Sequence, residues 1–240
     1  MKAVILTAGM ALRLRPLTDA TPKCLLKVKN KPILGQILEN LAENGIDEFV
    51  IVTGYLREQV LTYVETQYPE LKITFIYNEV YDSTNNIYSL WLTKNEVAGE
   101  SFLLLDGDIV FDKQIVELLN ECGHPSALAL RSSGHVGEED MKVMADKKGF
   151  VKEINKSMNP AEAAGESIGI ELFSAETSKL LFDELHIMME EENKVNVWYE
   201  EAFQRIINKG VKIAAVDVHD LKCMELDTVE DFEQAEKIDF

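Results

Sequence analysis

Short hydrophobic runs alternate with amphipathic stretches along much of the chain, and this pattern predicts an α/β fold. Lys2–Leu6, Phe49–Val52 and Ser101–Leu105 are apolar runs of the length expected for buried parallel strands. Between the first two runs, apolar residues recur at helical spacing from Ile33 to Leu41. Strands separated by helices at this spacing predict a wound sheet with neighbouring parallel strands.

The hydrophobic pattern also predicts the remaining elements. Further strands are expected at Leu25–Val28, Leu71–Tyr77, Ala127–Arg131, Gly165–Ile170, Val211–Val216 and Lys222–Leu226. Further helices are expected at Arg57–Val64, Lys113–Asn120, Glu176–Met189 and Val229–Ile238, and a hairpin at Lys142–Ala145 and Phe150–Ile154. The predicted core stripe of the helix over 176–189 is Leu180, Leu181, Leu185 and Met188. With no repeat and no linker rich in Pro and Gly, the 240 residues are expected to form one domain.

Charge narrows the classes of partner. The chain has 24 Lys and Arg against 42 Asp and Glu, a formal net charge of −18. This balance argues against binding to nucleic acid or to an anionic membrane surface. No apolar run approaches the ~20 residues of a membrane span. The few basic residues near the N-terminus therefore stand out against an acidic background.

The cysteines and histidines suggest no metal or disulfide framework. The three cysteines are far apart, odd in number and form no CxxC, which favours the reducing cytoplasm. The four histidines, His135 among them, show no ligand spacing and are assigned no role. A GxGxxG loop followed ~20 residues later by an acid is also absent, which argues against a nicotinamide or flavin enzyme.

The stretch ILTAGMALRLRPLTDATPK, residues 5–23, is the strongest candidate binding segment. A strand ends in Thr7, Ala8 and Gly9, small residues that let the backbone turn and approach a ligand. Backbone N–H groups in such a turn form a concave site for anions. Arg13 and Lys23 add positive charge, as a triphosphate requires. The alternative is an ordinary strand-to-loop connection with surface arginines.

Acidic residues follow two of the predicted strands. Asp106 and Asp108 come directly after the strand over 101–105, and Asp227 follows the strand over 222–226. In an open α/β sheet this edge is where ligands bind, and a buried acid there needs a cation or hydrogen-bond donors. Carboxylate oxygens suit Mg²⁺, which shares them with phosphates. The alternatives are a β-turn with solvated acids and, for Asp227, an acid at a helix N-terminus.

The N-terminal stretch resembles the signature of nucleotidyltransferases that activate sugar phosphates and alkyl phosphates. Its residues match L-[AT]-[AG]-G-x-G-[ST]-R-L-x-P-L-T followed by P-K, except that Ala11 replaces the second glycine and Leu12 the Ser or Thr. The resemblance implies a Rossmann-like, glycosyltransferase-A-like α/β fold with a mixed central sheet and helices on both faces. It also implies a nucleotide-binding half at about 1–130 and an acceptor-binding half at about 131–240.

Three further segments resemble the bacterial CTP:phosphocholine cytidylyltransferase branch of that family. They are NNIYSL from Asn85, WYEE from Trp198 and ELDT from Glu225. The resemblance implies that CTP reacts with a small phosphorylated amine, phosphocholine first and phosphoethanolamine or 2-aminoethylphosphonate next. The alternatives are a sugar-1-phosphate nucleotidyltransferase and a non-catalytic nucleotide-binding regulatory subunit.

The resemblance also implies roles for individual residues. Arg13 and Lys23 would be catalytic, and Asp108 and Asp227 would bind Mg²⁺. The nucleotide would contact Leu6, Ala8, Gly9, Met10, Arg13, Lys23, Tyr81, Asn86 and Asp106. The acceptor would contact Lys156, Glu166, Trp198, Tyr199 and Glu200, because aromatic faces and carboxylates hold an ammonium group. Asn86 could instead cap a helix, Lys156 could be a surface lysine, and both aromatics could be core residues. The sequence does not predict the oligomeric state.

Overall fold

A computed structural model describes residues 1–134 and 136–240, so His135 lies outside the described residues. The strands are β1 (Lys2–Thr7), β2 (Lys27–Val28), β3 (Lys31–Pro32), β4 (Glu48–Thr53), β5 (Lys72–Tyr77), β6 (Phe102–Asp106), β7 (Ile109–Phe111), β8 (Ala127–Arg131), β9 (Lys142–Ala145), β10 (Val151–Asn155), β11 (Gly165–Phe173), β12 (Ala214–Asp217) and β13 (Cys223–Glu225). The α-helices are α1 (Ile33–Glu43), α2 (Arg57–Gln67), α3 (Asn86–Leu92), α4 (Lys94–Val97), α5 (Gln114–Glu121), α6 (Ala175–His186), α7 (Glu200–Asn208) and α8 (Val229–Ala235).

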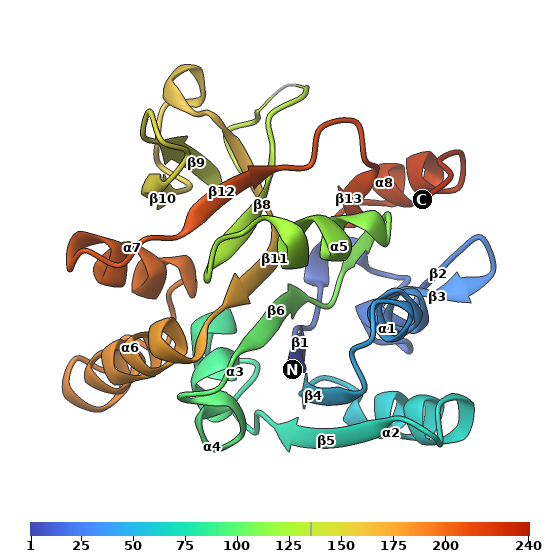
Figure 1. Ribbon diagram of the computed structural model, residues 1–240. Coiled ribbons are helices and arrows are strands. Elements are labelled where there is room, and N and C mark those ends of the chain that lie inside the picture. The colour runs from blue at the N-terminus through green and yellow to red at the C-terminus, as the bar shows by residue number, and fades with distance from the viewer. Residues whose placement is uncertain (135) are drawn as a thin grey trace.

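The centre of the molecule is a mixed sheet of nine strands (Figure 1). Its main path runs β10-β9-β11-β6-β1-β4-β5, and β8 pairs with β11 and β12. Strands β6, β1, β4 and β5 are parallel to one another, whereas β11 is antiparallel to β6 and β8. The prediction of a mixed Rossmann-like sheet with helices on both faces is confirmed.

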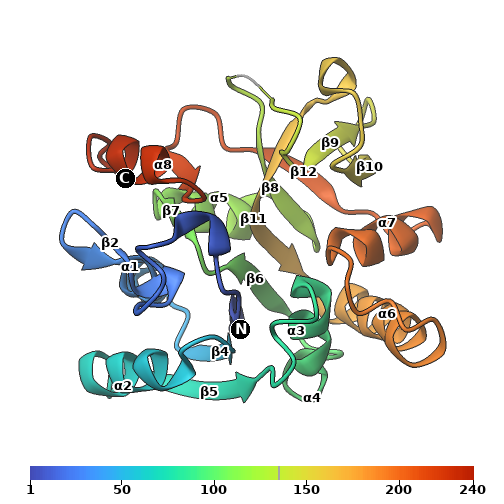
Figure 2. The same cartoon turned by 180° about the vertical axis from the view of Figure 1, so that it is seen from behind.

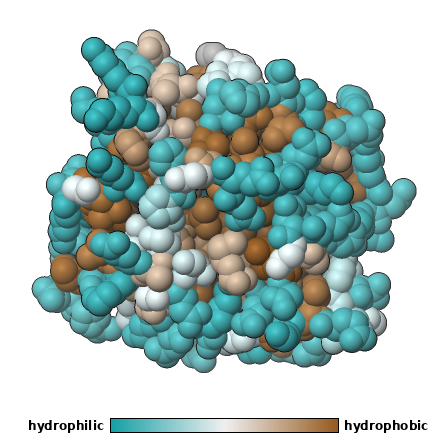
Figure 3. All heavy atoms as spheres, viewed as in Figure 1, coloured by the Kyte–Doolittle hydropathy of each residue, from teal (hydrophilic) through white to brown (hydrophobic). Residues whose placement is uncertain are grey.

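Alternation along β1 explains why both faces of the sheet are covered. Ala3 and Ile5 pack into one core with α1, α2 and α5, while Val4 and Leu6 pack into the opposite core with α3, α6 and α7. Because successive side chains of a strand point to opposite faces, a continuous apolar run needs helices on both sides. Figures 1 and 2 show these two layers from the front and from behind. On the face drawn in Figure 3, hydrophilic residues form most of the rim.

A small second sheet brings the end of the chain to the edge of the large one. Strand β13 pairs antiparallel with β7, and the N–H of Leu226 donates to the carbonyl of Asp108 at 3.0 Å. Residues 108 and 227, which are far apart in sequence, therefore lie side by side just beyond β6. No helix in the described ranges is long and apolar enough to cross a membrane.

Several expected elements differ in detail from the structure. Residues 23–25 form a 3₁₀ turn before β2, and β12 begins at Ala214 rather than at residue 211. The helix expected over 176–189 becomes a π-helix at Ile187–Glu191. Leu180, expected in the core, is 42% exposed, whereas Leu181, Leu185 and Met188 are buried. Leu180 lies at the margin of the apolar stripe that the other three residues form along the helix. Its side chain therefore faces solvent while the other three are buried.

Candidate active site

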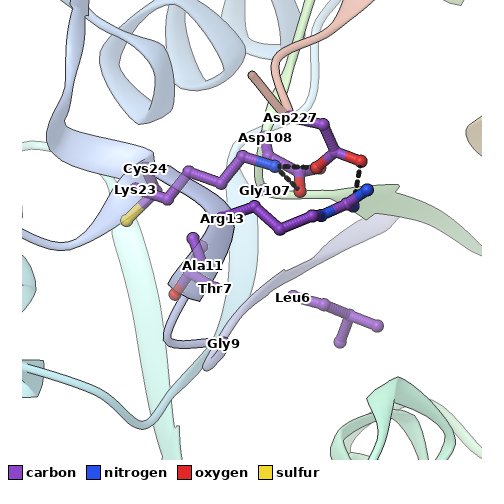
Figure 4. A pocket seen from close by; sticks show the side chains of 10 residues that line it. All are labelled: Leu6, Thr7, Gly9, Ala11, Arg13, Lys23, Cys24, Gly107, Asp108 and Asp227. Carbon is purple, nitrogen blue, oxygen red and sulfur yellow. Dashed lines mark hydrogen bonds and ion pairs between the residues drawn. The ribbon is translucent and has the colours of Figure 1, made fainter. Parts of the chain in front are cut away.

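The loop after β1 forms one wall of a cavity of about 160 Å³ (Figure 4). Leu6, Gly9, Arg13 and Lys23 line it together with Asp108 and Asp227. Ala11 adopts φ 46° and ψ 54°, the left-handed conformation that favours glycine. The alanine that replaces the expected second glycine therefore retains the backbone shape that a glycine would adopt.

Lys23 joins the two aspartates predicted to bind metal. Its Nζ lies 2.6 Å from Oδ2 of Asp108 and 2.7 Å from Oδ1 of Asp227, while Arg13 pairs with the other oxygen of Asp227 (Figure 4). Burial alone would lower the pKa of Lys23, but the two carboxylates raise it above its usual value. Burial would likewise raise the pKa of Asp227, but Lys23 and Arg13 hold it below the usual value. The contacts thus favour the charged forms of both Lys23 and Asp227.

A third carboxylate, which the sequence pattern did not predict, joins this site. Asp108, Glu225 and Asp227 each place an oxygen within 4.8 Å of the others. Among the described residues, Oδ1 of Asp108 is buried without a hydrogen-bond partner. An all-oxygen donor set with one unpartnered oxygen fits a hard cation such as Mg²⁺. Glu225 was identifiable as the first acid of the ELDT segment.

A second cavity, of about 220 Å³, shares Leu6, Gly9 and Asp108 with the first. The predicted nucleotide residues that line it are Leu6, Ala8, Gly9, Tyr81, Asn86 and Asp106. Met10 is half-buried in the same loop and lies outside the linings of both described cavities. Burial, reinforced by the nearby carboxylate of Asp108, raises the pKa of Asp106 well above its usual value.

The two asparagines of the NNIYSL segment have separate structural tasks. Asn85 caps α3, and its side chain accepts a hydrogen bond from the N–H of Asn86. Asn86 accepts a hydrogen bond from the N–H of Tyr199 at 2.9 Å. Asn86 therefore lines the cavity of about 220 Å³, and its side-chain amide oxygen binds the backbone of Tyr199 in the predicted acceptor half.

Four of the five predicted acceptor residues line a smaller cavity of about 60 Å³, namely Lys156, Glu166, Trp198 and Glu200. Tyr199 differs from the expectation of a paired aromatic cage, because its side chain is fully buried and its phenol donates to Oδ2 of Asp106 at 3.1 Å. Consecutive residues at the start of a helix point in different directions, so Trp198 is exposed and Tyr199 packs inward.

Glu166 already has a cationic neighbour in this cavity. It forms an ion pair with Arg131, which lies beside it on β8. Burial and a hydrogen bond shared with Asp140 raise the pKa of Glu166 to about 7, although Arg131 acts in the opposite direction. The second cavity shares Asp108 with the first and Glu225 with the third, so the three form neighbouring parts of one site.

A wound α/β sheet with a basic anion loop and a carboxylate cluster at its strand ends is typical of proteins that bind nucleoside triphosphates with a metal. The family model described as nucleotidyl transferase matches residues 2–140, which is more than half of the chain. The chain belongs to this family, and the predicted family is confirmed.

Individual relatives refine this placement. The chain is 42% identical over 108 residues to the choline-phosphate cytidylyltransferase of Streptococcus pneumoniae, covering 45% of this chain and 44% of that enzyme. It is 26% identical over 234 residues to the 2-aminoethylphosphonate cytidylyltransferase of Lancefieldella rimae, covering 95% and 88% of the two chains. The structure of the Streptococcus pneumoniae CTP:phosphocholine cytidylyltransferase superposes with a TM-score of 0.78 at 24% identity, covering 98% and 97%. At that identity the superposition shows the fold alone.

Proposed function

We propose that this protein is a Mg²⁺-dependent cytidylyltransferase that joins CTP to a small phosphorylated amine and releases pyrophosphate. The observation that carries the proposal is the contact of Lys23 with both Asp108 and Asp227 beside the loop after β1. Relatives named as cytidylyltransferases for choline phosphate and for 2-aminoethylphosphonate support this choice of reaction and acceptor. We further propose the division into a nucleotide half at about 1–130 and an acceptor half at about 131–240.

In the proposed reaction an acceptor phosphate oxygen attacks the α-phosphorus of CTP, and the bond to pyrophosphate breaks. Such a transfer depends on positioning and charge neutralisation more than on a general base. Backbone N–H groups after β1 would hold the triphosphate, while Arg13 and Lys23 would neutralise it. Asp108 and Asp227, with Glu225 beside them, would hold Mg²⁺, which when bound neutralises phosphate charge.

The nucleotide would extend from this clamp into the cavity that Tyr81 and Asn86 line, and the acceptor into the cavity beside Trp198. Asp106 contacts both regions, since it lines both cavities and accepts the hydrogen bond of Tyr199. We propose that Asp106 positions the two substrates relative to each other. The reducing cytoplasm is the expected place of action.

A pyrophosphate-release assay with CTP, Mg²⁺ and a panel of acceptors tests the function. We expect turnover with amine phosphates and at least a 100-fold loss in Asp108→Asn and Asp227→Asn, because each removes a charged metal ligand. Asp220→Asn, at an exposed position, is the matched control. Wild-type turnover in Asp108→Asn would contradict the metal assignment.

Two other functions have distinct outcomes in the same assay. A preference for glucose 1-phosphate over every amine phosphate would favour a sugar-1-phosphate nucleotidyltransferase, which the family match also allows. Nucleotide binding without turnover on any acceptor would favour a regulatory subunit. The substitutions Ala11 and Leu12 in the signature support that second alternative, while the intact Lys23 clamp argues against it.

A further inference from the structure

An alkylammonium group already lies in the cavity proposed for the acceptor. The Nζ of Lys156 sits 4.3 Å from the centroid of the Trp198 ring, at a distance typical of a cation–π contact. Trp198 is 45% exposed, and it lines this cavity together with Lys156. The side chain of Lys156 thus shows the kind of group that this surface accepts, a protonated primary amine.

Glu200 lies in the same cavity, and no cationic side chain of residues 1–134 or 136–240 forms an ion pair with it. It is only 6% exposed, and among the described residues no group donates to its Oε2. A second glutamate of the cavity, Glu166, is paired with Arg131, and the third, Glu225, belongs to the carboxylate cluster with Asp108 and Asp227. A buried carboxylate oxygen without a donor is costly, which makes Glu200 the group that a cationic ligand would satisfy.

The aromatic content of the cavity is low. Trp198 is the one aromatic residue among the described lining residues, because Tyr199 is fully buried and its hydroxyl is engaged by Asp106. A quaternary ammonium group is recognised by several aromatic faces and has no N–H with which to satisfy a carboxylate. A primary ammonium has three donors and needs only one ring face.

We propose that the acceptor of this enzyme carries a protonated primary amine, which Glu200 binds through Oε2 and Trp198 through its ring face. The proposal rests on the proposed function and names its acceptor class. Phosphoethanolamine and 2-aminoethylphosphonate are therefore better acceptors than phosphocholine, which reverses the order that the sequence resemblance suggests. The bound amine takes the place of the Lys156 ammonium, and Glu200 is the residue that determines specificity.

The test compares kcat/KM for phosphoethanolamine and for phosphocholine, with CTP and Mg²⁺, in the wild type and in Glu200→Gln. We expect the wild type to prefer phosphoethanolamine by about 10-fold or more, in line with the strength of a hydrogen bond between charged groups. Glu200→Gln should lower kcat/KM for phosphoethanolamine by about 10- to 100-fold and change that for phosphocholine much less. Glu201→Gln is the matched control, because Glu201 pairs with Lys194 and Arg205 and is not among the residues lining the cavity.

Calorimetry with the same two ligands and CTP-free protein measures the preference without turnover. Tighter binding of phosphoethanolamine that is lost in Glu200→Gln supports the proposal. Equal or tighter binding of phosphocholine in the wild type, or an equal loss for both ligands in Glu200→Gln, would overturn it. Turnover that favours phosphocholine would overturn the primary-amine assignment and leave the cytidylyltransferase function intact. Turnover restricted to sugar phosphates would reject both.

Discussion

The side chain of Asn86 accepts a hydrogen bond from the backbone N–H of Tyr199 at 2.9 Å and so joins two segments 113 positions apart. Asn86 begins α3, and Tyr199 immediately precedes α7. The phenol of Tyr199 in turn reaches Asp106 at the end of β6, at 3.1 Å. Trp198 and Glu200, on either side of Tyr199, are therefore fixed relative to the strand end that precedes the metal-site residue Asp108.

Replacing Asn86 by Ala should loosen the acceptor side of the site more than the nucleotide side. Loss of one hydrogen bond should lower the free energy of unfolding by about 1 kcal/mol. We expect the KM for the acceptor to rise more than the KM for CTP. The hydrogen bond to Tyr199 holds in place its two chain neighbours, Trp198 and Glu200, which are proposed to contact the acceptor. Asn86→Asp is the matched variant, since a carboxylate oxygen can still accept the N–H of Tyr199. A rise confined to the KM for CTP would instead support a direct nucleotide contact.

Lys23 should substitute electrostatically for the metal when no metal is bound. In Lys23→Ala, Asp108 and Asp227 lose their shared cation, and we expect a loss of about 1–3 kcal/mol in the free energy of unfolding. This is less than for a fully buried pair, because both carboxylates retain contact with water. Mg²⁺ should then raise the melting temperature of Lys23→Ala more than that of the wild type.

The measurement is the melting temperature of both proteins across a Mg²⁺ titration. Lys27→Ala, at an exposed position outside the site, controls for the general loss of one positive charge. Identical Mg²⁺ responses in the three proteins would show that Asp108 and Asp227 do not form the metal site.

The left-handed conformation of Ala11 predicts that Ala11→Gly stabilises the protein. A non-glycine residue in that region costs roughly 1–2 kcal/mol, while the added freedom of an unfolded glycine costs roughly 0.4–1 kcal/mol. The net gain should lie between about 0 and 1.6 kcal/mol, measured from denaturant unfolding midpoints. Ala42→Gly, at an exposed position in α1, should have the opposite sign, with a loss of about 0.5–1 kcal/mol. A loss of stability in Ala11→Gly would show that the loop is not strained.

The sequence predicted the sheet and the acidic end of β6 well because these features are local. An apolar run such as Lys2–Leu6 forms a buried strand wherever it lies in the sheet, and Asp106 and Asp108 follow from chain order. The contacts of Lys23 with Asp108 and Asp227 are not local, since they depend on β13 pairing with β7, a strand of three residues that the hydrophobic pattern did not indicate. The family resemblance nevertheless named all three residues, Lys23 through the signature loop, Asp108 through its place after the strand over 101–105 and Asp227 through the ELDT segment.

The acceptor side was harder to predict, because the direction of each side chain there depends on tertiary packing. Trp198 and Tyr199 are adjacent in sequence, yet one is 45% exposed and the other is 0% exposed. Their separation follows from the hydrogen bonds of Tyr199 to Asn86 and Asp106, residues far away in the chain. The sequence could place aromatic residues near the pocket but could not determine which ring would face it.

The buried carboxyl of Glu200 should make the stability of the protein depend on pH. Burial raises the pKa of Glu200 from 4.5 to about 7, although Lys156 acts in the opposite direction. The folded state then binds the proton more strongly than the unfolded state, so this group lowers stability as the pH rises from about 4.5 to about 7. The full penalty, on the order of 3 kcal/mol, applies above pH 7, where the carboxylate is charged.

Glu200→Gln is neutral at every pH and should escape this penalty. We expect the stability of the variant relative to the wild type to increase by about 3 kcal/mol between pH 4 and pH 8, as measured by denaturant unfolding. Glu190→Gln provides the baseline for the same exchange at an exposed position. If the difference in unfolding free energy between the wild type and Glu200→Gln stays constant from pH 4 to pH 8, the carboxyl of Glu200 is not buried. An increase would show that Glu200 is maintained at a cost to the fold, as expected of a carboxylate that binds a cationic substrate.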